Sequence, residues 1–317
     1  MPLPALLENR LRLPVVAAPM FLASGPDLVL ACCRAGIVGT FPAKNQRDLD
    51  GLDQWLQQIS SGLAASTTQT GDKPAPYGVN LIVHPSNKTL EQELDLCAAY
   101  RVPIIITSLG AVPQIVDRVH AYGGIVFHDV VNRRHAEKAA AAGVDGLIAV
   151  SAGAGGHTGL ANPFALIAEI RRFFNGTLLL AGSLGSGSDI AAAQTIGADL
   201  AYMGTRFLTA TETLIGDAYR QMVVDAGLDD LVLTRALTGA LASMLRPSVR
   251  DAGFDPDSLV EGSKATYNHR GTESKAWKHV WSAGQGVGSI DSVRTVAQIV
   301  DDYAAGYEAA RRDLASD

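Results

Sequence analysis

The 317-residue sequence has few charged residues, few cysteines and no long hydrophobic run. Charged residues make up 18% of the chain, the formal net charge is -6, and Lys and Arg form no run. A basic surface for nucleic acid or for an anionic membrane is therefore not expected. No apolar stretch approaches the roughly 20 residues that cross a bilayer, and the N-terminus lacks the pattern of a signal peptide. We expect a cytoplasmic protein that acts on a small molecule and has neither nucleic-acid nor membrane partners.

The three cysteines exclude two further classes of protein. Cys32, Cys33 and Cys97 are odd in number and two of them are adjacent, so they fit neither a disulfide framework nor a C-x-x-C metal site. We expect them to be buried thiols. No histidine has zinc-ligand spacing and no carboxylates cluster as magnesium ligands do, so we predict no metal.

What the sequence does contain is a repeat of short β-branched runs, most of them followed by an Ala/Leu-rich stretch with helical spacing. The runs show no polar alternation, which is typical of parallel strands covered on both faces. Eight strands are predicted, at residues 14–18, 36–40, 77–82, 103–107, 124–127, 146–150, 177–181 and 200–203. Helices are predicted between them, at residues 27–34, 49–59, 89–99, 112–121, 133–142, 163–173 and 188–196.

An eight-fold βα series favours an α/β fold of the (β/α)8 TIM-barrel type, with a doubly wound open sheet as the alternative. Residues 209–284 break the rhythm and are interpreted as a mainly helical inserted cap. Residues 1–208 and 285–317 would then form the barrel. Apolar residues from Val293 to Tyr303 recur at helical spacing and predict a final helix over the strand-eight side. The cap is a candidate dimer interface, so a homodimer is one possible assembly.

Two glycine-rich strand ends predict a phosphate site. Strand seven runs into Gly182-Ser183, and strand eight ends at Gly204-Thr205. Free backbone amides at such ends bind phosphate in this fold, although the glycines are also compatible with plain tight turns. Ser186 with Asp189 fits a helix cap, which favours the turn interpretation for part of the run. The order of the glycines does not match a dinucleotide-binding loop.

Histidines follow two other strands. His157 lies in the loop Gly155-Gly156-His157 after strand six, where an imidazole can exchange protons near neutral pH. It is the candidate catalytic residue, and the alternative is a histidine that only bonds the loop. His128 follows strand five and has a structural or a functional role. Neither Ser151 nor Ser183 lies in a G-x-S-x-G elbow, so acyl chemistry has no support.

Three further segments offer places for a flat ring. Ala18-Pro19-Met20 ends the first strand with a fixed backbone and an apolar side chain. Asn80 at the end of the third strand can donate and accept hydrogen bonds. Gln285 lies in a glycine-rich stretch that is expected to return from the cap to the mouth of the barrel. A core methionine and a turn asparagine are the alternatives.

Taken in order, these motifs resemble the nitronate monooxygenase family, formerly called 2-nitropropane dioxygenases. The resemblance covers about residues 13–207 and the Gly284-Gln285-Gly286 segment. It implies an FMN cofactor whose ring lies near the first and third strands and whose phosphate lies near the seventh and eighth. The residues implied to contact FMN are Ala18, Pro19, Met20, Asn80, His128, Gly155, Gly156, Ala181, Gly182, Ser183, Gly204, Thr205 and Gln285.

The resemblance also implies that His157 faces the flavin and that the protein oxidises alkyl nitronates with O2. Flavin reductases that act on quinones or enoyl thioesters with NAD(P)H share this barrel and are the first alternative. Asp129 stands where some of these relatives place a lysine, which puts a flavin contact there in doubt. A non-enzymatic flavin-binding protein is the second alternative.

Overall fold

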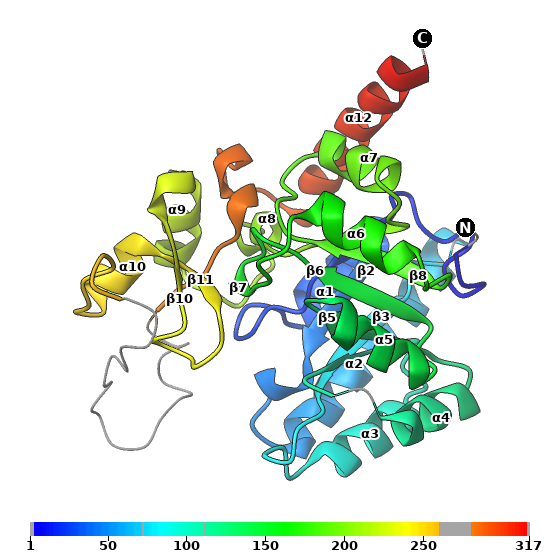
Figure 1. The fold of residues 1–317 in the computed structure, drawn as a ribbon. Helices are drawn as coiled ribbons and strands as arrows, with labels where there is room; N and C mark the ends of the chain where they lie inside the picture. The colour runs from blue at the N-terminus through cyan, green and yellow to red at the C-terminus, as the bar shows by residue number, and fades with distance from the viewer. Residues whose placement is uncertain (1–2, 72, 111, 260–279, 316–317) are drawn as a thin grey trace.

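The computed structural model describes residues 3–71, 73–110, 112–259 and 280–315, and these residues form a closed barrel with a side lobe (Figure 1). Eight parallel strands close in the order β1-β2-β3-β4-β5-β6-β8-β9, and β9 pairs with β1. The predicted TIM barrel is confirmed, and the open-sheet alternative is wrong. The strands are β1 (Val15–Ala17), β2 (Val38–Pro42), β3 (Tyr77–Ile82), β4 (Ile104–Ser108), β5 (Ile125–Val130), β6 (Gly146–Val150), β8 (Thr177–Ala181) and β9 (Leu200–Met203).

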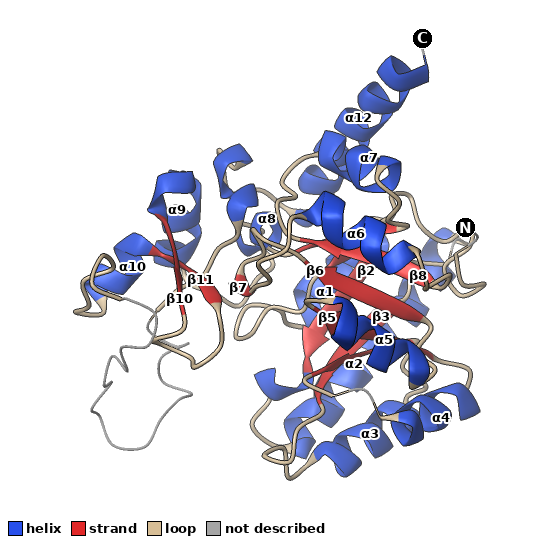
Figure 2. Ribbon diagram, viewed as in Figure 1, coloured by secondary structure: helices blue, strands red, loops and turns tan. Residues whose placement is uncertain are grey.

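Helices surround the barrel, as the colouring by secondary structure shows (Figure 2). Gly143 and Gly197 follow two of them with positive φ angles of 85° and 106°, a conformation that suits a glycine just after a helix. The second helix runs eleven residues beyond its predicted end at residue 59. The helices are α1 (Pro26–Arg34), α2 (Leu49–Thr70), α3 (Leu90–Ala99), α4 (Pro113–Ala121), α5 (Arg133–Ala141), α6 (Pro163–Arg171), α7 (Gly187–Thr195), α8 (Thr205–Leu208) and α12 (Val296–Ala315), with a short 3-10 turn at Ala43–Asn45.

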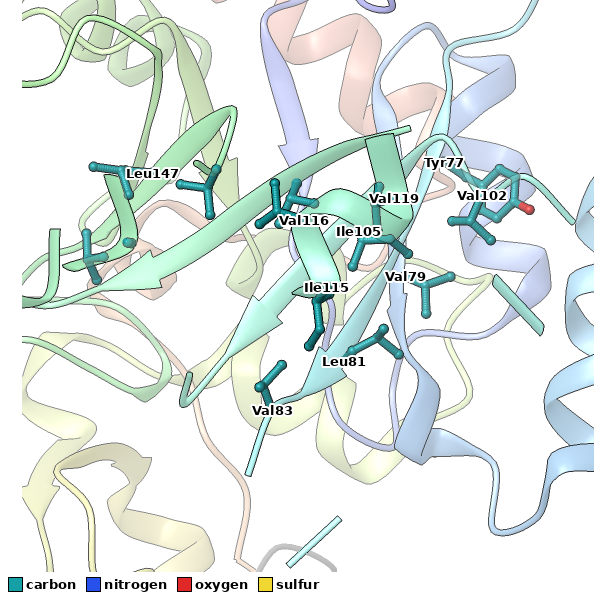
Figure 3. Packing of buried hydrophobic residues seen from close by; sticks show 14 of the residues in the cluster. Tyr77, Val79, Leu81, Val83, Val102, Ile105, Ile115, Val116, Val119 and Leu147 are labelled. Carbon is teal, nitrogen blue, oxygen red and sulfur yellow. The ribbon is translucent and has the colours of Figure 1, made fainter. Parts of the chain in front are cut away.

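Strand alternation divides the core into two layers. Val79, Ile105 and Leu147 point outward and pack against helix residues such as Val116 and Val119 (Figure 3). The inward layer is a separate apolar cluster inside the barrel, built from Val16, Val38, Ile104, Ile106, Phe127, Ile148, Leu179, Ala181 and Leu200. A barrel interior filled in this way is a packed core and not a pore. The three cysteines are free and buried, as expected.

The final helix covers the strand-eight side of the barrel, as predicted. In α12, Ile299, Val300 and Tyr303 pack with Met203 of β9. Val293, which the spacing placed on this helix, lies before its first residue and is 40% exposed.

The insert after β9 contains helices α9 (Asp217–Asp225) and α10 (Arg246–Asp251) and a 3-10 turn at Leu228–Asp230, and a further 3-10 turn at Gln285–Ser289 follows it. It also contains an antiparallel hairpin that the sequence analysis did not predict, β10 (Leu231–Thr234) with β11 (Ala242–Leu245). Strand β11 pairs in addition with β7 (Gly156–His157), a short strand in the loop after β6. Residues 260–279 of the predicted cap lie outside the described residues, and the division into barrel and cap subdomains remains a prediction.

Replacing Gly187 by alanine should destabilise the fold. A Cβ at Gly187 would meet the backbone of α12, at the carbonyl of Tyr303 and 2.6 Å from the nitrogen of Tyr307. Backbone cannot move aside as a flexible side chain does, so Gly187→Ala should lower the free energy of unfolding by about 1–3 kcal/mol, measured by urea denaturation. A Cβ at Gly288 would lie 3.8 Å from Leu228. The control Gly288→Ala should therefore match the wild type, and equal stability of both variants would contradict this account.

Candidate active site

A polar layer lies on top of the apolar barrel interior, at the C-terminal ends of the strands. Two residues beyond the inward-facing Ile106, Phe127 and Leu200, strand alternation places Ser108, Asp129 and Tyr202 on the same inner face. Asn80 belongs to this layer, because its neighbours Val79 and Leu81 point outward. Catalytic groups in this fold lie at this edge of the barrel. The polar layer is therefore the floor of the candidate site.

Hydrogen bonds connect three of these residues in one direction. The Asn80 amide nitrogen donates to the carbonyl of Ile106 (3.2 Å) and to Ser108 Oγ (2.8 Å). Ser108 Oγ in turn donates to Asp129 Oδ2 (2.5 Å). Asp129 Oδ1 is buried and has no hydrogen-bond partner among the described residues. Burial raises the pKa of Asp129 to about 6, and the Ser108 bond only partly offsets this.

His128 lies on the other face of β5. It alternates with the inward-facing Phe127 and Asp129, and its Nδ1 lies 2.7 Å from Thr107 Oγ1 in the layer between strands and helices. Burial lowers the pKa of His128 to about 4, so the ring is neutral at pH 7. The structure thus places His128 away from the other predicted site residues and brings Asp129 to the mouth instead. Period-two alternation within strand five was the signal that could have shown this.

His157 is held at the mouth by the insert. In the antiparallel pairing of β7 with β11, His157 lies opposite Ala242 and Gly156 lies opposite Ser243. The Thr158 amide donates a hydrogen bond to the Leu241 carbonyl (3.1 Å). The Thr158 hydroxyl also donates to the Ser151 carbonyl, which closes the base of the loop. Part of His157 is exposed to solvent. The protein atoms around its ring still remove enough water to lower the pKa of the imidazole. A neutral imidazole at pH 7 is able to accept a proton.

Three chain segments meet backbone to backbone beside this loop. The Gly153 carbonyl accepts from the amide of Gln285 (2.8 Å), and Ser183 Oγ donates to the side-chain oxygen of Gln285 (3.2 Å). A Cβ at Gly284 would lie 2.6 Å from the nitrogen of Gly155. The structure therefore brings Gly155, Ser183 and Gln285 together, although up to 130 residues separate them in the sequence. Gly155 is explained in part by this packing.

The end of β8 presents backbone amides in an unusual conformation. Gly182 (φ 110°) and Ser183 (φ 58°) are both left-handed, which suits glycine and strains serine. The amides of Gly182 and Leu184 make no hydrogen bond to any described residue. The Ser183 amide between them donates to the Gly153 carbonyl (3.4 Å), so Gly182 and Leu184 supply the amides of this turn that are able to bind an anion.

The two amides just before α7 are bonded to the side chain of its cap. Ser186 and Asp189 form the predicted capping box, in which Asp189 Oδ2 accepts from the amides of Gly185 and Ser186, both at 2.8 Å. The amides of Gly182 and Leu184 precede this cap and are not used by it.

The end of β9 lies against the loop after β1. A Cβ at Gly204 would lie 3.6 Å from Ala18 Cβ and 3.8 Å from Met20 Sδ, which is ordinary contact. No packing demand therefore explains this glycine, and its amide makes no hydrogen bond to a described residue. Ala18, Pro19 and Met20 are half-buried beside it. The Thr205 hydroxyl is buried and accepts from the amide of Gly284 (2.9 Å), so one of its sites is used within the protein.

Comparisons with known proteins identify the family. A family model described as nitronate monooxygenase matches residues 5–306. The chain belongs to the nitronate monooxygenase family. This family consists of oxidoreductases, so the alternative of a non-enzymatic binding protein is not supported.

Several relatives share the sequence or the fold. A Mycobacterium tuberculosis protein named a putative monooxygenase is 32% identical over 69% of this chain, which spans only 63% of its length. A nitronate monooxygenase of Paraburkholderia phytofirmans is 27% identical over 77% of this chain and 76% of its own. The structure of FabK from Thermotoga maritima is 26% identical, covers 98% of this chain and 96% of its own, and superposes with a TM-score of 0.76. A nitroalkane oxidase of Streptomyces ansochromogenes is 24% identical, covers 98% and 100%, and has a TM-score of 0.81, which shows the fold.

Two further findings limit the chemistry of the described residues. They contain no group of three or more His, Cys, Asp or Glu residues placed to hold a metal. Among the same residues, no helix is both long and apolar enough to cross a membrane.

His128 is buried between the strands and the helices, so the free energy of unfolding should depend on pH in the acidic range. In unfolded chains a histidine protonates near pH 6.5, whereas folded His128 resists protonation until about pH 4. The unfolded state therefore binds more protons between these values, and folding stability falls as the pH falls from 6.5 to 4. Between pH 6.5 and pH 4, the free energy of unfolding of His128→Gln should fall by about 3 kcal/mol less than that of the wild type. Urea denaturation at several pH values measures it. His84→Gln, at an exposed site, is the control, and parallel curves for all three proteins would argue against a buried neutral His128.

Proposed function

We propose that this protein binds FMN at the mouth of the barrel and uses it to oxidise alkyl nitronates with O2. The observation that carries the proposal is the position of His157, which β11 holds beside the glycine-rich ends of β6 and β8. Family membership supports a flavin-dependent oxidoreductase. The substrate and the choice of FMN belong to the proposal.

The residues present fit FMN at both of its ends. The amides of Gly182, Leu184 and Gly204 would hold the phosphate, because they lack partners among the described residues and lie on adjacent strands. Ala18 and Met20 would contact the ring, and the Asn80 amide would bond its polar edge. Ser183 and Gln285, already bonded to each other, would close the phosphate end.

When bound, FMN would supply electron transfer between the substrate and O2. His157 would orient the substrate by donating an N–H hydrogen bond to a nitro oxygen. For a neutral nitroalkane, the same imidazole would take the proton from the α-carbon, and its lowered pKa keeps it in the accepting form at neutral pH. A preformed nitronate has already lost that proton, so it requires only the orienting bond.

The phosphate site predicts a preference for FMN over riboflavin. Hydrogen bonds from several amides to a charged phosphate should make FMN bind about 100-fold more tightly than riboflavin, measured by quenching of flavin fluorescence. Ser183→Ala removes a hydroxyl at the phosphate end of the site. This change should lower the affinity for FMN about 10-fold and leave the affinity for riboflavin unchanged. Ser258→Ala changes an exposed hydroxyl in the insert and is the matched control. Equal affinity for both flavins would refute the phosphate site.

The role of His157 predicts different losses with two substrates. His157→Asn should lower kcat/KM by about 100-fold or more with a neutral nitroalkane, because a general base is lost. With propyl-2-nitronate the loss should be about 10-fold, the effect of one hydrogen bond. Oxygen consumption measures both, with His135→Asn at an exposed position as the control. If the FMN-loaded wild type consumes no oxygen with the nitronate, the proposed substrate is wrong.

A second candidate function is oxidoreduction of acyl thioesters. A CoA-thioester dehydrogenase of Mycobacterium tuberculosis is 28% identical over 84% of this chain and 72% of its own length. Exposed apolar residues also follow two strands at the mouth, Leu109 after β4 (68% exposed) and Leu160 in the loop after β6 (67% exposed). A bulky apolar substrate would cover them. Rapid anaerobic bleaching of the flavin by NADH or NADPH, followed by reoxidation with an enoyl thioester, would favour this candidate.

A further inference from the structure

The polar layer contains a carboxyl group whose role neither the family nor the mechanism above explains. Asp129 Oδ1 is buried inside the barrel, below the proposed ring site, and no residue in the described part of the chain bonds it. A buried polar atom left unpaired is costly, and it is retained where it has a function. No charged side chain of the described residues forms an ion pair with Asp129.

The direction of the hydrogen-bond chain fixes what each group presents to the mouth. The Ile106 carbonyl can only accept, so the atom of Asn80 that faces it must be the amide nitrogen. That nitrogen also donates to Ser108, so the Ser108 proton must go to Asp129 Oδ2. The Asn80 side-chain oxygen makes no bond to a described residue and is the free acceptor of the chain. A protonated Asp129 with its proton on Oδ1 keeps the Ser108 bond to Oδ2 intact.

We propose that Asp129 is a positioning residue for the cofactor ring. Acting through Ser108, it orients the Asn80 amide toward the ring, and its ionisation controls how readily the site accepts negative charge on the ring. This inference rests on the proposed binding of FMN. It concerns a residue that the resemblance left in doubt, and it assigns that residue a definite role.

The side chains that face Asp129 from the neighbouring strands carry no charge that would offset its own. From β4 it faces Ser108, and the inward-facing residues of β6 are Ile148 and Val150, which carry no charge. The titratable group on the inner face of β9 is Tyr202, whose pKa burial and Asp129 raise well above the ordinary value, so it stays neutral. His128 faces the outer layer, and His157 lies above, in the loop after β6. With no cation to neutralise it, an ionised Asp129 would oppose added negative charge nearby.

Sulfite is a suitable probe, because its addition to oxidised flavin leaves negative charge on the ring and bleaches the visible absorbance. We expect the sulfite affinity of the FMN-loaded wild type to fall about 10- to 100-fold between pH 5 and pH 7.5, relative to Asp129→Asn. The wild-type transition should lie near pH 6, where Asp129 loses its proton. Free FMN measured in parallel accounts for the titration of sulfite itself.

Two further variants separate a positioning role from a merely structural one. Ser108→Ala removes the donor to Asp129 Oδ2, so the transition should move to higher pH, whereas Asp129→Asn should abolish it. Asp117→Asn makes the same change of charge on the exposed face of α4 and should behave as the wild type. Spectra recorded before sulfite is added report whether each variant retains FMN.

The outcomes distinguish this inference from the proposed function. If the wild type binds no FMN, the proposed function fails and the inference fails with it. If FMN binds and the wild type follows the pH profile of Asp129→Asn, the role of Asp129 is overturned while FMN binding stands. If Asp129→Asn does not fold, free FMN is the reference instead, and a wild type whose sulfite affinity follows the pH profile of free FMN overturns the role of Asp129.

Discussion

The mouth of this barrel depends on a backbone contact among three segments, centred on the Gly153 carbonyl. The loop after β6, the end of β8 and the segment returning from the insert approach so closely that a Cβ at Gly155, Gly182 or Gly284 would lie within 2.9 Å of another backbone atom. A side chain at any of these positions would push the segments apart. The same contact places Ser183, Gln285 and the base of the His157 loop next to one another. The glycines therefore create the site by allowing the approach, in addition to any ligand they bind.

The barrel was predictable from the sequence because each of its units repeats the same physical pattern. Buried parallel strands need uninterrupted apolar runs and their helices need a one-sided apolar face, and both patterns are long enough to recognise. The β10–β11 hairpin escaped prediction because each strand has four residues, and because its third strand is Gly156–His157, which has no strand pattern at all. Pairing with a distant segment forms that strand, and no local propensity indicates such pairing.

The site was only partly predictable, for a related reason. Strand ends indicated where Asn80, His157 and Ser183 would lie, because closure of the barrel brings all strand ends to one edge, and Gln285 was expected there from its glycine-rich stretch after the cap. Which side chain of a strand faces inward depends on register, and a shift of one residue exchanges the two faces. His128 was selected as an ionisable residue at a strand end, but alternation turns it outward. The neighbouring Asp129 lies inside, where its role depends on Ser108, a contact between two strands that spacing along the chain does not reveal.

The insert holds the His157 loop and the returning segment in place together. Strand β11 lies between the His157 loop and the returning segment, since Ser243 pairs with Gly156 on one side and its hydroxyl donates to the Ala283 carbonyl on the other. A displacement of this strand would therefore move His157 and Ala283 together. Figure 1 shows the hairpin β10–β11 next to β7 in the loop after β6. Sequence changes in the insert are thus transmitted to the imidazole through backbone hydrogen bonds.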